Sequence, residues 1–213
     1  MAFMSDRIHP VYKNLIRLRS NGQCWGHLPP NDEVFDFFER VGVLAKPKNI
    51  LEFGFNLGFS ASYQLQLFPD ATLVSYDPQR WKIYAAIGQY NKEFIPPTEN
   101  ICASTLATFV WGEKFIFQRK KSMQVMDDYP TVGHFDYAFV DGDHTHQGLR
   151  TDIKNCVELG IPYIIVDNVK EIPVLQSVVD EFTNLKEVDR CQYYTYYPRD
   201  NSLRTDDMIL LAL

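Results

Sequence analysis

Apolar residues along the chain gather in short uninterrupted runs, separated by segments in which they recur at helical spacing. The short runs are typical of strands buried on both faces of a parallel sheet, and the intervening segments are typical of amphipathic helices. The predicted strands begin at Ile50 and continue with Thr72–Tyr76, Phe115–Phe117, Tyr137–Val140 and Tyr163–Val166.

A first helix is predicted to begin at Asn31 or Asp32, either of which can cap it. Strands that alternate with helices imply right-handed crossovers and a doubly wound sheet. The apolar positions of the first helix are Val34, Phe35, Phe38 and Val41, and further helices are predicted over Ser60–Phe68, Trp81–Phe94, Gly148–Leu159 and from about Val174 to Leu185.

The end of the chain follows another pattern. Two β-rich runs, Val188–Tyr197 and Met208–Leu213, flank a turn-rich stretch and are predicted to pair as an antiparallel hairpin. We therefore predict an α/β fold with a Rossmann-like, doubly wound, seven-stranded sheet, mostly parallel with a C-terminal antiparallel hairpin. Residues 31–213 would form this domain, and residues 1–30 an N-terminal segment that could cover an active site.

Composition narrows the function classes. The chain of 213 residues carries 21 basic and 27 acidic side chains, a net charge of −6, which argues against a nucleic-acid partner. The cysteines lack CxxC spacing, and neither a signal peptide nor an 18-residue apolar run is found. We expect a cytoplasmic protein with reduced thiols and no membrane partner; the cysteines are Cys24, Cys102, Cys156 and Cys191.

The run after the first strand has the spacing Glu-x-Gly-x-x-x-Gly-x-Ser, from Glu52 through Gly54 and Gly58 to Ser60. This spacing differs from the GxGxxG of most nicotinamide and flavin proteins. Glycines at a strand-to-helix turn let a ligand approach the backbone, and the helix N-terminus offers free N–H groups. The Ser60 hydroxyl could bind a ligand carboxylate.

An acidic residue, Asp77, directly follows the second strand. Such a carboxylate can accept hydrogen bonds from both ribose hydroxyls of an adenosine ligand. The alternative is a simple turn aspartate before Pro78. The separation of Asp77 from the glycine turn favours the nucleoside interpretation.

Polar residues also end the fourth and fifth strands. Asp141 follows the fourth strand, and Asp167 and Asn168 follow the fifth. Ligands of open parallel sheets bind at the carboxyl ends of strands, so these residues should meet the glycine turn at one edge. Two carboxylates and an amide oxygen suit Mg²⁺ or a similar ion. The alternative is that they cap the following helices.

These motifs resemble those of class I S-adenosylmethionine (SAM)-dependent methyltransferases, specifically the small metal-dependent O-methyltransferases of the catechol and caffeoyl-CoA type. The chain is closer still to the methyltransferase-domain group with Val-Asp-Gly-Asp-His after the fourth strand. The resemblance, from about Asn31 onward, implies a divalent cation on Asp141, Asp167 and Asn168. It implies SAM as cofactor, held by Glu52, Gly54, Phe55, Asn56, Gly58, Ser60, Asp77, Ser122 and Asp141.

The chain departs from this family at two points. The acidic or small polar pair that contacts adenine after the third strand is replaced by a basic stretch, residues 118–122, in which Ser122 is the best candidate. The lysine that is a candidate base in the family is replaced by Asp143 and His144. His144, beside Asp141, is therefore our candidate base, although a purely structural histidine is an equal alternative.

The resemblance implies methylation of a hydroxyl on a small-molecule acceptor, with N-methylation left open if no metal binds. A glycosyltransferase that uses Asp141 and Asp143 as a DxD motif is one alternative, and a non-catalytic SAM-binding module is another. A nicotinamide dehydrogenase ranks third because its glycine spacing differs. A homodimer is left open, and the tyrosines near the end of the chain are assigned no role.

Overall fold

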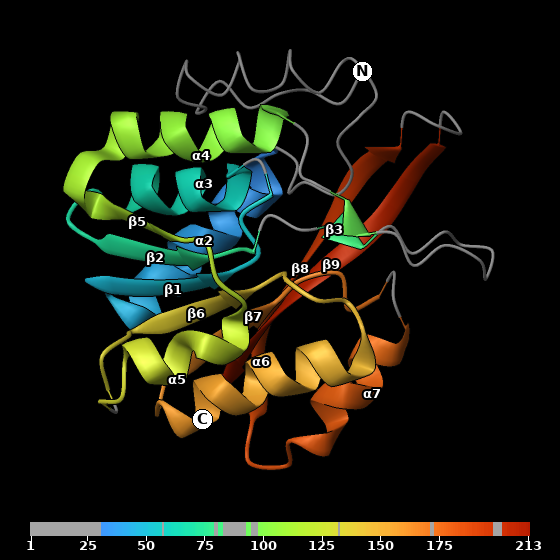
Figure 1. Ribbon diagram of the computed structural model, residues 1–213. Coiled ribbons are helices and arrows are strands. Elements are labelled where there is room, and N and C mark those ends of the chain that lie inside the picture. The colour runs from blue at the N-terminus through green and yellow to red at the C-terminus, as the bar shows by residue number, and fades with distance from the viewer. Residues whose placement is uncertain are drawn as a thin grey trace.

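The sheet has seven strands in the order β5-β2-β1-β6-β7-β9-β8, with helices on both faces (Figure 1). This arrangement comes from a computed structural model that describes residues 31–56, 58–78, 81–82, 93–94, 98–131, 133–170, 173–197 and 202–213. The N-terminal segment, residues 1–30, and its expected role as a cover lie outside these residues.

The predicted strands all form, and the fold class is confirmed. Five of them pair in parallel, and β9 pairs antiparallel with both β7 and β8, so the last strand lies inside the sheet. The bounds are β1 Asn49–Phe53, β2 Thr72–Tyr76, β5 Phe115–Gln118, β6 Tyr137–Val140, β7 Tyr163–Val166, β8 Lys186–Tyr197 and β9 Ser202–Ala212.

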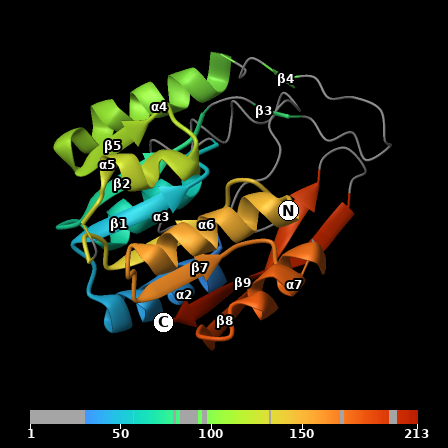
Figure 2. The same cartoon turned by 60° about the horizontal axis from the view of Figure 1, so that its bottom comes forward.

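The described helices cover the two faces of the sheet in two sets of three. Figure 2 shows α6 and α7 side by side over one face. The helices are α2 Asp32–Ala45, α3 Phe59–Leu67 and α4 Thr98–Trp111 on one face, and α5 Val125–Asp128, α6 His146–Glu158 and α7 Pro173–Glu181 on the other, with short 3₁₀ turns η1 Gly112–Lys114 and η2 Ser122–Gln124.

Each face of the sheet packs its own apolar core. Because successive side chains of a strand point to opposite faces, Tyr137 and Phe139 of β6 join the cluster under α2 and α3. Their neighbours Ala138 and Val140 join the cluster under α6 and α7. The central strands are therefore buried on both sides, which explains their nearly continuous apolar sequence.

Helix α2 begins as predicted. The Asn31 side chain accepts a hydrogen bond from the backbone N–H of Val34 at 3.0 Å, which satisfies one of the free donors of the first turn. Further along, Arg40 pairs with Asp189 of β8 at 2.7 Å. This helix thus ties the first part of the domain to its last hairpin.

Between β2 and β5 one predicted helix is wrong and one helix was not predicted. The helix expected over Trp81–Phe94 is wrong at its described ends, where β3 Trp81–Lys82 and β4 Glu93–Phe94 pair antiparallel; residues 83–92 are outside the description. Aromatic residues at both ends favour extended backbone. Helix α4 was not predicted, because its apolar residues and its β-branched threonines, isoleucine and valine form no single stripe.

None of the described helices is both long and apolar enough to cross a membrane.

Replacement of Phe38 by alanine should destabilise the domain by about 3–5 kcal/mol, because it leaves a cavity in the core. Phe38 is fully buried, and its ring centroid lies 5.9 Å from that of Phe139 in the central strand β6. Urea denaturation followed by circular dichroism measures the change. Phe109→Ala is the control, since this side chain is 85% exposed on α4. Equal effects of the two substitutions would contradict the packing described here.

Candidate active site at the carboxyl edge of the sheet

The sequence-predicted site residues meet along one edge of the sheet. Beyond the last paired residues, backbone N–H groups continue the ladder from strand to strand: Gly54 N donates to Tyr76 O at 2.9 Å and Asp141 N to Phe53 O at 2.8 Å. Asp77 N and Asp167 N continue it on either side, donating to Gln118 O and Val140 O at 3.1 Å each. The carboxyl ends of β5, β2, β1, β6 and β7 therefore form one continuous edge.

Both glycines of the predicted motif are required by geometry. Gly54 has φ +94°, and a Cβ on it would lie 2.1 Å from the carbonyl oxygen of Asp141. Gly58 has φ +74°, and a Cβ there would lie 2.4 Å from the Phe55 ring. Neither position tolerates a side chain, because L residues rarely adopt this backbone conformation and the space is already filled.

The carboxylate of Asp77 holds the turn after β1. Its Oδ2 accepts hydrogen bonds from the backbone N–H groups of Phe55 and Asn56, at 3.0 Å each, and the residue is 8% exposed. Asn56 itself adopts a left-handed conformation with φ +47°, which asparagine tolerates better than most residues. Asp77, the residue predicted to bind the ribose, thus also shapes the glycine turn.

Glu52 lies inside the protein, behind the turn. It is 0% exposed and accepts hydrogen bonds from the hydroxyls of Ser60 at 2.6 Å and Ser75 at 2.5 Å. Gln64 also donates to it at 3.3 Å, and the Tyr137 hydroxyl donates to Gln64 at 2.7 Å. Glu52 therefore holds α3 against the sheet, and its assignment to the cofactor stays a prediction.

This network changes the interpretation of Ser60. Its hydroxyl proton was expected to meet a ligand carboxylate, but in the structure it is donated to Glu52. Because a hydroxyl has one proton, it cannot also donate to a ligand. The backbone N–H groups at the start of α3 remain the donors suited to an anionic group.

Ser122 begins the 3₁₀ turn η2 after β5, and its contact with the nucleoside base stays a prediction. Asn155 of α6 donates to its carbonyl oxygen at 3.4 Å. Asp152, one turn earlier on α6, is 1% exposed, and burial raises its pKa to about 7; the nearby Ser122 hydroxyl lowers it in part and the Asp143 charge raises it. The sequence did not identify Asp152.

The candidate base, His144, lies beside Asp141. Its Nε2 is 2.9 Å from Asp141 Oδ1, and the two side chains are 39% and 21% exposed. Partial burial acts to lower the pKa of His144, but the hydrogen bond to Asp141 and the charges of Asp141, Asp206 and Asp143 outweigh it, so the pKa is raised. Asp143 accepts from Thr145 N at 3.0 Å, and Thr145 caps α6.

The carboxylate of Asp167 lies in a buried acidic cluster. Tyr193 of β8 donates its hydroxyl to Asp167 Oδ1 at 2.5 Å, and the Asn168 amide nitrogen donates to Asp206 of β9 at 2.5 Å. Burial raises the pKa of Asp167 well above its ordinary value, and the charge of Asp141 adds to the shift. Tyr193 and Asp206 are therefore site residues that the sequence did not identify.

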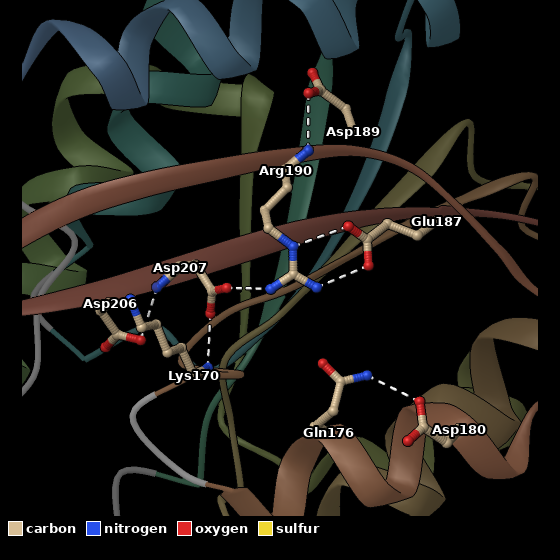
Figure 3. A network of polar contacts seen from close by, with 8 residues as sticks. All are labelled: Lys170, Gln176, Asp180, Glu187, Asp189, Arg190, Asp206 and Asp207. Carbon is tan, nitrogen blue, oxygen red and sulfur yellow. Dashed lines mark hydrogen bonds and ion pairs between the residues drawn. The ribbon is translucent and has the colours of Figure 1, made fainter.

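The loop that carries Asn168 is fixed from the other face of β9 by Asp207. Figure 3 shows the Arg190 guanidinium between Glu187 and Asp207. Asp207 Oδ1 also accepts from the backbone N–H of Lys170 at 2.6 Å. Adjacent residues of one strand point to opposite faces, so Asp206 and Asp207 hold this loop from both sides. The glutamate and aspartate partners raise the pKa of Arg190.

The predicted metal ligands meet at this edge, but their fit to a cation is partial. Among the described residues, no three His, Cys, Asp or Glu side chains are grouped so as to hold a metal ion. The expected set therefore depends on the amide of Asn168. Because its nitrogen donates to Asp206, its oxygen is directed away from that carboxylate. Hard oxygen donors of this kind suit Mg²⁺, although one oxygen of Asp167 already accepts from Tyr193.

No family model matches the chain, and no curated protein matches its sequence. Solved structures match over nearly its whole length. The O-methyltransferase TomG from Streptomyces achromogenes, in complex with SAM and involved in tomaymycin synthesis, is similar at a TM-score of 0.66 and 14% identity, covering 100% of this chain and 92% of that one.

An O-methyltransferase from Bacillus cereus, in complex with SAH, is similar at a TM-score of 0.63 and 13% identity, covering 96% of this chain and 91% of that one. The fold is that of the class I methyltransferases. The same fold extends to a precorrin 8W decarboxylase from Methanobacterium thermoautotrophicum, with a TM-score of 0.53, 13% identity and 99% coverage of both chains. Fold alone therefore does not fix the reaction.

The buried carboxyl of Glu52 should make stability depend on pH. Burial raises its pKa from 4.5 to about 7, although the Ser60 and Ser75 hydroxyls act to lower it. Between these values the native chain holds a proton that the unfolded chain has lost, so the free energy of unfolding falls as pH rises. Glu52 should account for about 1–3 kcal/mol of this fall. Glu52→Gln should lose that part and keep the part due to Asp152 and Asp167, whose pKa values burial also raises.

Urea denaturation of both proteins between about pH 4.5 and pH 7.5 measures this difference. Glu113→Gln, an exposed glutamate in η1, is the matched control and should keep the wild-type slope. A Glu52→Gln protein with the wild-type pH dependence would show that Glu52 is ionised in the native state.

Proposed function

We propose that the chain is a SAM-dependent methyltransferase that methylates a hydroxyl group of a small molecule. One observation carries this proposal. The turn between β1 and α3 excludes side chains at Gly54 and Gly58 and has its amides held by Asp77, at the edge where open α/β sheets bind ligands. Two proteins of the same fold have SAM or SAH bound.

In this proposal the cofactor lies along the carboxyl edge from β5 to β6. Asp77 binds the ribose, and the turn from Gly54 to Gly58 with the first N–H groups of α3 binds the methionine carboxylate. Ser122 contacts the base. Glu52 and Ser60 act behind the turn, because their side chains are bonded to each other.

A divalent cation, Mg²⁺ or similar, would be held by Asp141, Asp167 and Asn168 and would lower the pKa of an acceptor hydroxyl there. The charge of the site supports this assignment, because Asp206 adds a further carboxylate beside Asn168. The Tyr193 hydroxyl holds Asp167 in place, and the Asn168 amide holds Asp206.

His144 is the residue that would take the acceptor proton. Asp141 orients its imidazole, in the way that a carboxylate orients a catalytic base. As the acceptor oxygen forms its bond to the methyl carbon and the carbon–sulfur bond breaks, the hydroxyl proton passes to His144. Positioning supplies most of the acceleration, since the sulfonium is a good leaving group.

The glycosyltransferase alternative requires Asp141 and Asp143 to share one cation. Their arrangement favours it less, because Asp143 Oδ1 accepts from Thr145 N within its own turn. A non-catalytic SAM-binding module fits the same glycine turn and differs from an enzyme only in turnover.

The purified chain should bind SAM with micromolar affinity, and Asp77→Ala should weaken binding at least about tenfold, because both the glycine turn and the ribose lose their acceptor. Isothermal titration with SAM, and separately with UDP-sugars, each with and without Mg²⁺, makes the measurement. Asp70→Ala is the control, since this aspartate is exposed in the loop before β2. Binding of UDP-sugars with Mg²⁺ and none of SAM would overturn the proposal.

Binding of Mn²⁺, used as a paramagnetic substitute for Mg²⁺, should fall at least about tenfold in Asp167→Asn, since a carboxylate ligand is lost. Electron paramagnetic resonance of free Mn²⁺ measures it. Asp143→Asn should bind Mn²⁺ like the wild type, whereas the DxD alternative expects this substitution to weaken binding.

Methyl transfer from labelled SAM to phenols and sugars should then stop with EDTA and return with Mg²⁺. Transfer that ignores EDTA would remove the cation from the proposal.

A further inference from the structure

A buried carboxyl on α6 is left without a partner next to the proposed cofactor site. Asp152 is 1% exposed, and neither of its carboxyl oxygens has a hydrogen-bond partner within the part of the chain that the structure describes. Burial of such a group without a partner is unfavourable, and native proteins rarely keep one without a function. Neither the sequence motifs nor the chemistry proposed above uses it.

The surroundings of Asp152 are the ends of three strands. A Cβ on Gly142, just after β6, would lie 3.3 Å from Asp152 Oδ2 and 3.5 Å from the carbonyl carbon of Phe53, the last residue of β1. The Ser122 hydroxyl, just after β5, approaches the carboxyl closely enough to affect its pKa. Asp152 therefore lies where the edge between β5 and β6 meets α6.

Two features place this carboxyl next to the position proposed for the base. Oδ2 fits against the backbone after β6 because Gly142 has no side chain, since a Cβ there would lie only 3.3 Å away. Ser122 is held beside α6, because Asn155 donates to its carbonyl oxygen. A base bound against Ser122 would therefore lie next to Asp152 as well.

The nucleoside base proposed to lie at Ser122 needs an acceptor. The exocyclic amino group of adenine is a hydrogen-bond donor, and the turn from β5 to Ser122 carries three basic side chains, Arg119, Lys120 and Lys121, which are donors themselves. Lys120 is moreover paired with Asp128 at 2.6 Å. The unpartnered carboxyl of Asp152 is an acceptor in the right place.

We propose that Asp152 determines the specificity for the base, by accepting a hydrogen bond from the amino group of adenine. The inference rests on the proposed SAM-binding function and adds to it a recognition group contributed by α6. The partner that the carboxyl lacks in the protein would be supplied by the ligand, and a base without the amino group would leave it unsatisfied.

The test is a cycle of two ligands and three proteins. The ligands are S-adenosylhomocysteine and its analogue with an unsubstituted purine base, which lacks only the amino group; binding is measured by isothermal titration. Wild type should prefer the adenine ligand about tenfold or more, as expected for a hydrogen bond to a buried carboxyl group. In Asp152→Ala the adenine ligand should weaken to the level of the purine ligand, so that the preference disappears.

Asp152→Asn keeps a carbonyl acceptor and should retain a reduced preference of about threefold to fivefold, weaker than the carboxyl group provides. Lys154→Ala, an exposed residue of the same helix, is the matched control and should keep the full preference. A purely structural role of Asp152 would weaken both ligands equally and leave their ratio unchanged.

The outcomes separate the inference from the function on which it rests. If wild type binds S-adenosylhomocysteine and Asp152→Ala keeps the preference for adenine, the inference is wrong and the proposed function stands. If wild type binds neither ligand, the proposed function is wrong and the inference falls with it. Loss of the preference in Asp152→Ala, with partial retention in Asp152→Asn, supports both.

Discussion

The turn after β1 depends on a backbone contact that leaves no room for a side chain at Gly54. A Cβ on Gly54 would collide with the carbonyl oxygen of Asp141, so the backbones at the ends of β1 and β6 lie too close together for a side chain. This contact places the glycine turn beside the carboxylate after β6. The ladder of N–H groups continues from this pair to β2 and β7, so Asp77 and Asp167 lie along the same edge.

Behind this edge, ionisable side chains hold the secondary structure elements together. Glu52 is enclosed by the hydroxyls of Ser60 and Ser75, which join β1 to α3 and β2. Further along the sheet, in β9, Asp206 and Asp207 fix the loop after β7 from the two faces of that strand. Buried polar networks of this kind are costly when incomplete and specific when satisfied. They explain how side chains carried by loops after the strands can keep one geometry.

Most of the fold was predictable, because a strand buried on both faces has an apolar run that periodicity detects. The motif at Gly54 and Gly58 and the acid at Asp77 were predictable for a similar reason, since strand ends carry ligands in open sheets. Helix α4 was not, because its apolar residues lie all around it and no stripe marks it.

Asp152, Tyr193 and Asp206 were also not predictable, because their roles arise from neighbours far away in the sequence. Tyr193 resembles any tyrosine of a β-rich run until β8 is known to lie near Asp167. The pair Asp206 and Asp207 at the start of an apolar run was the one available signal, since acids rarely sit in a buried strand without partners.

The place of β9 between β7 and β8 has a consequence for the order in which the domain folds. As the chain leaves the ribosome, β8 appears before β9. It has no neighbour in the sheet until β9 follows, because β9 is the strand that pairs with both β7 and β8. Until then the outer edge of β7 is open to wrong pairing with other chains. Asp206 and Asp207 belong to this late strand, so the loop that carries Asn168 becomes ordered only when the sheet closes.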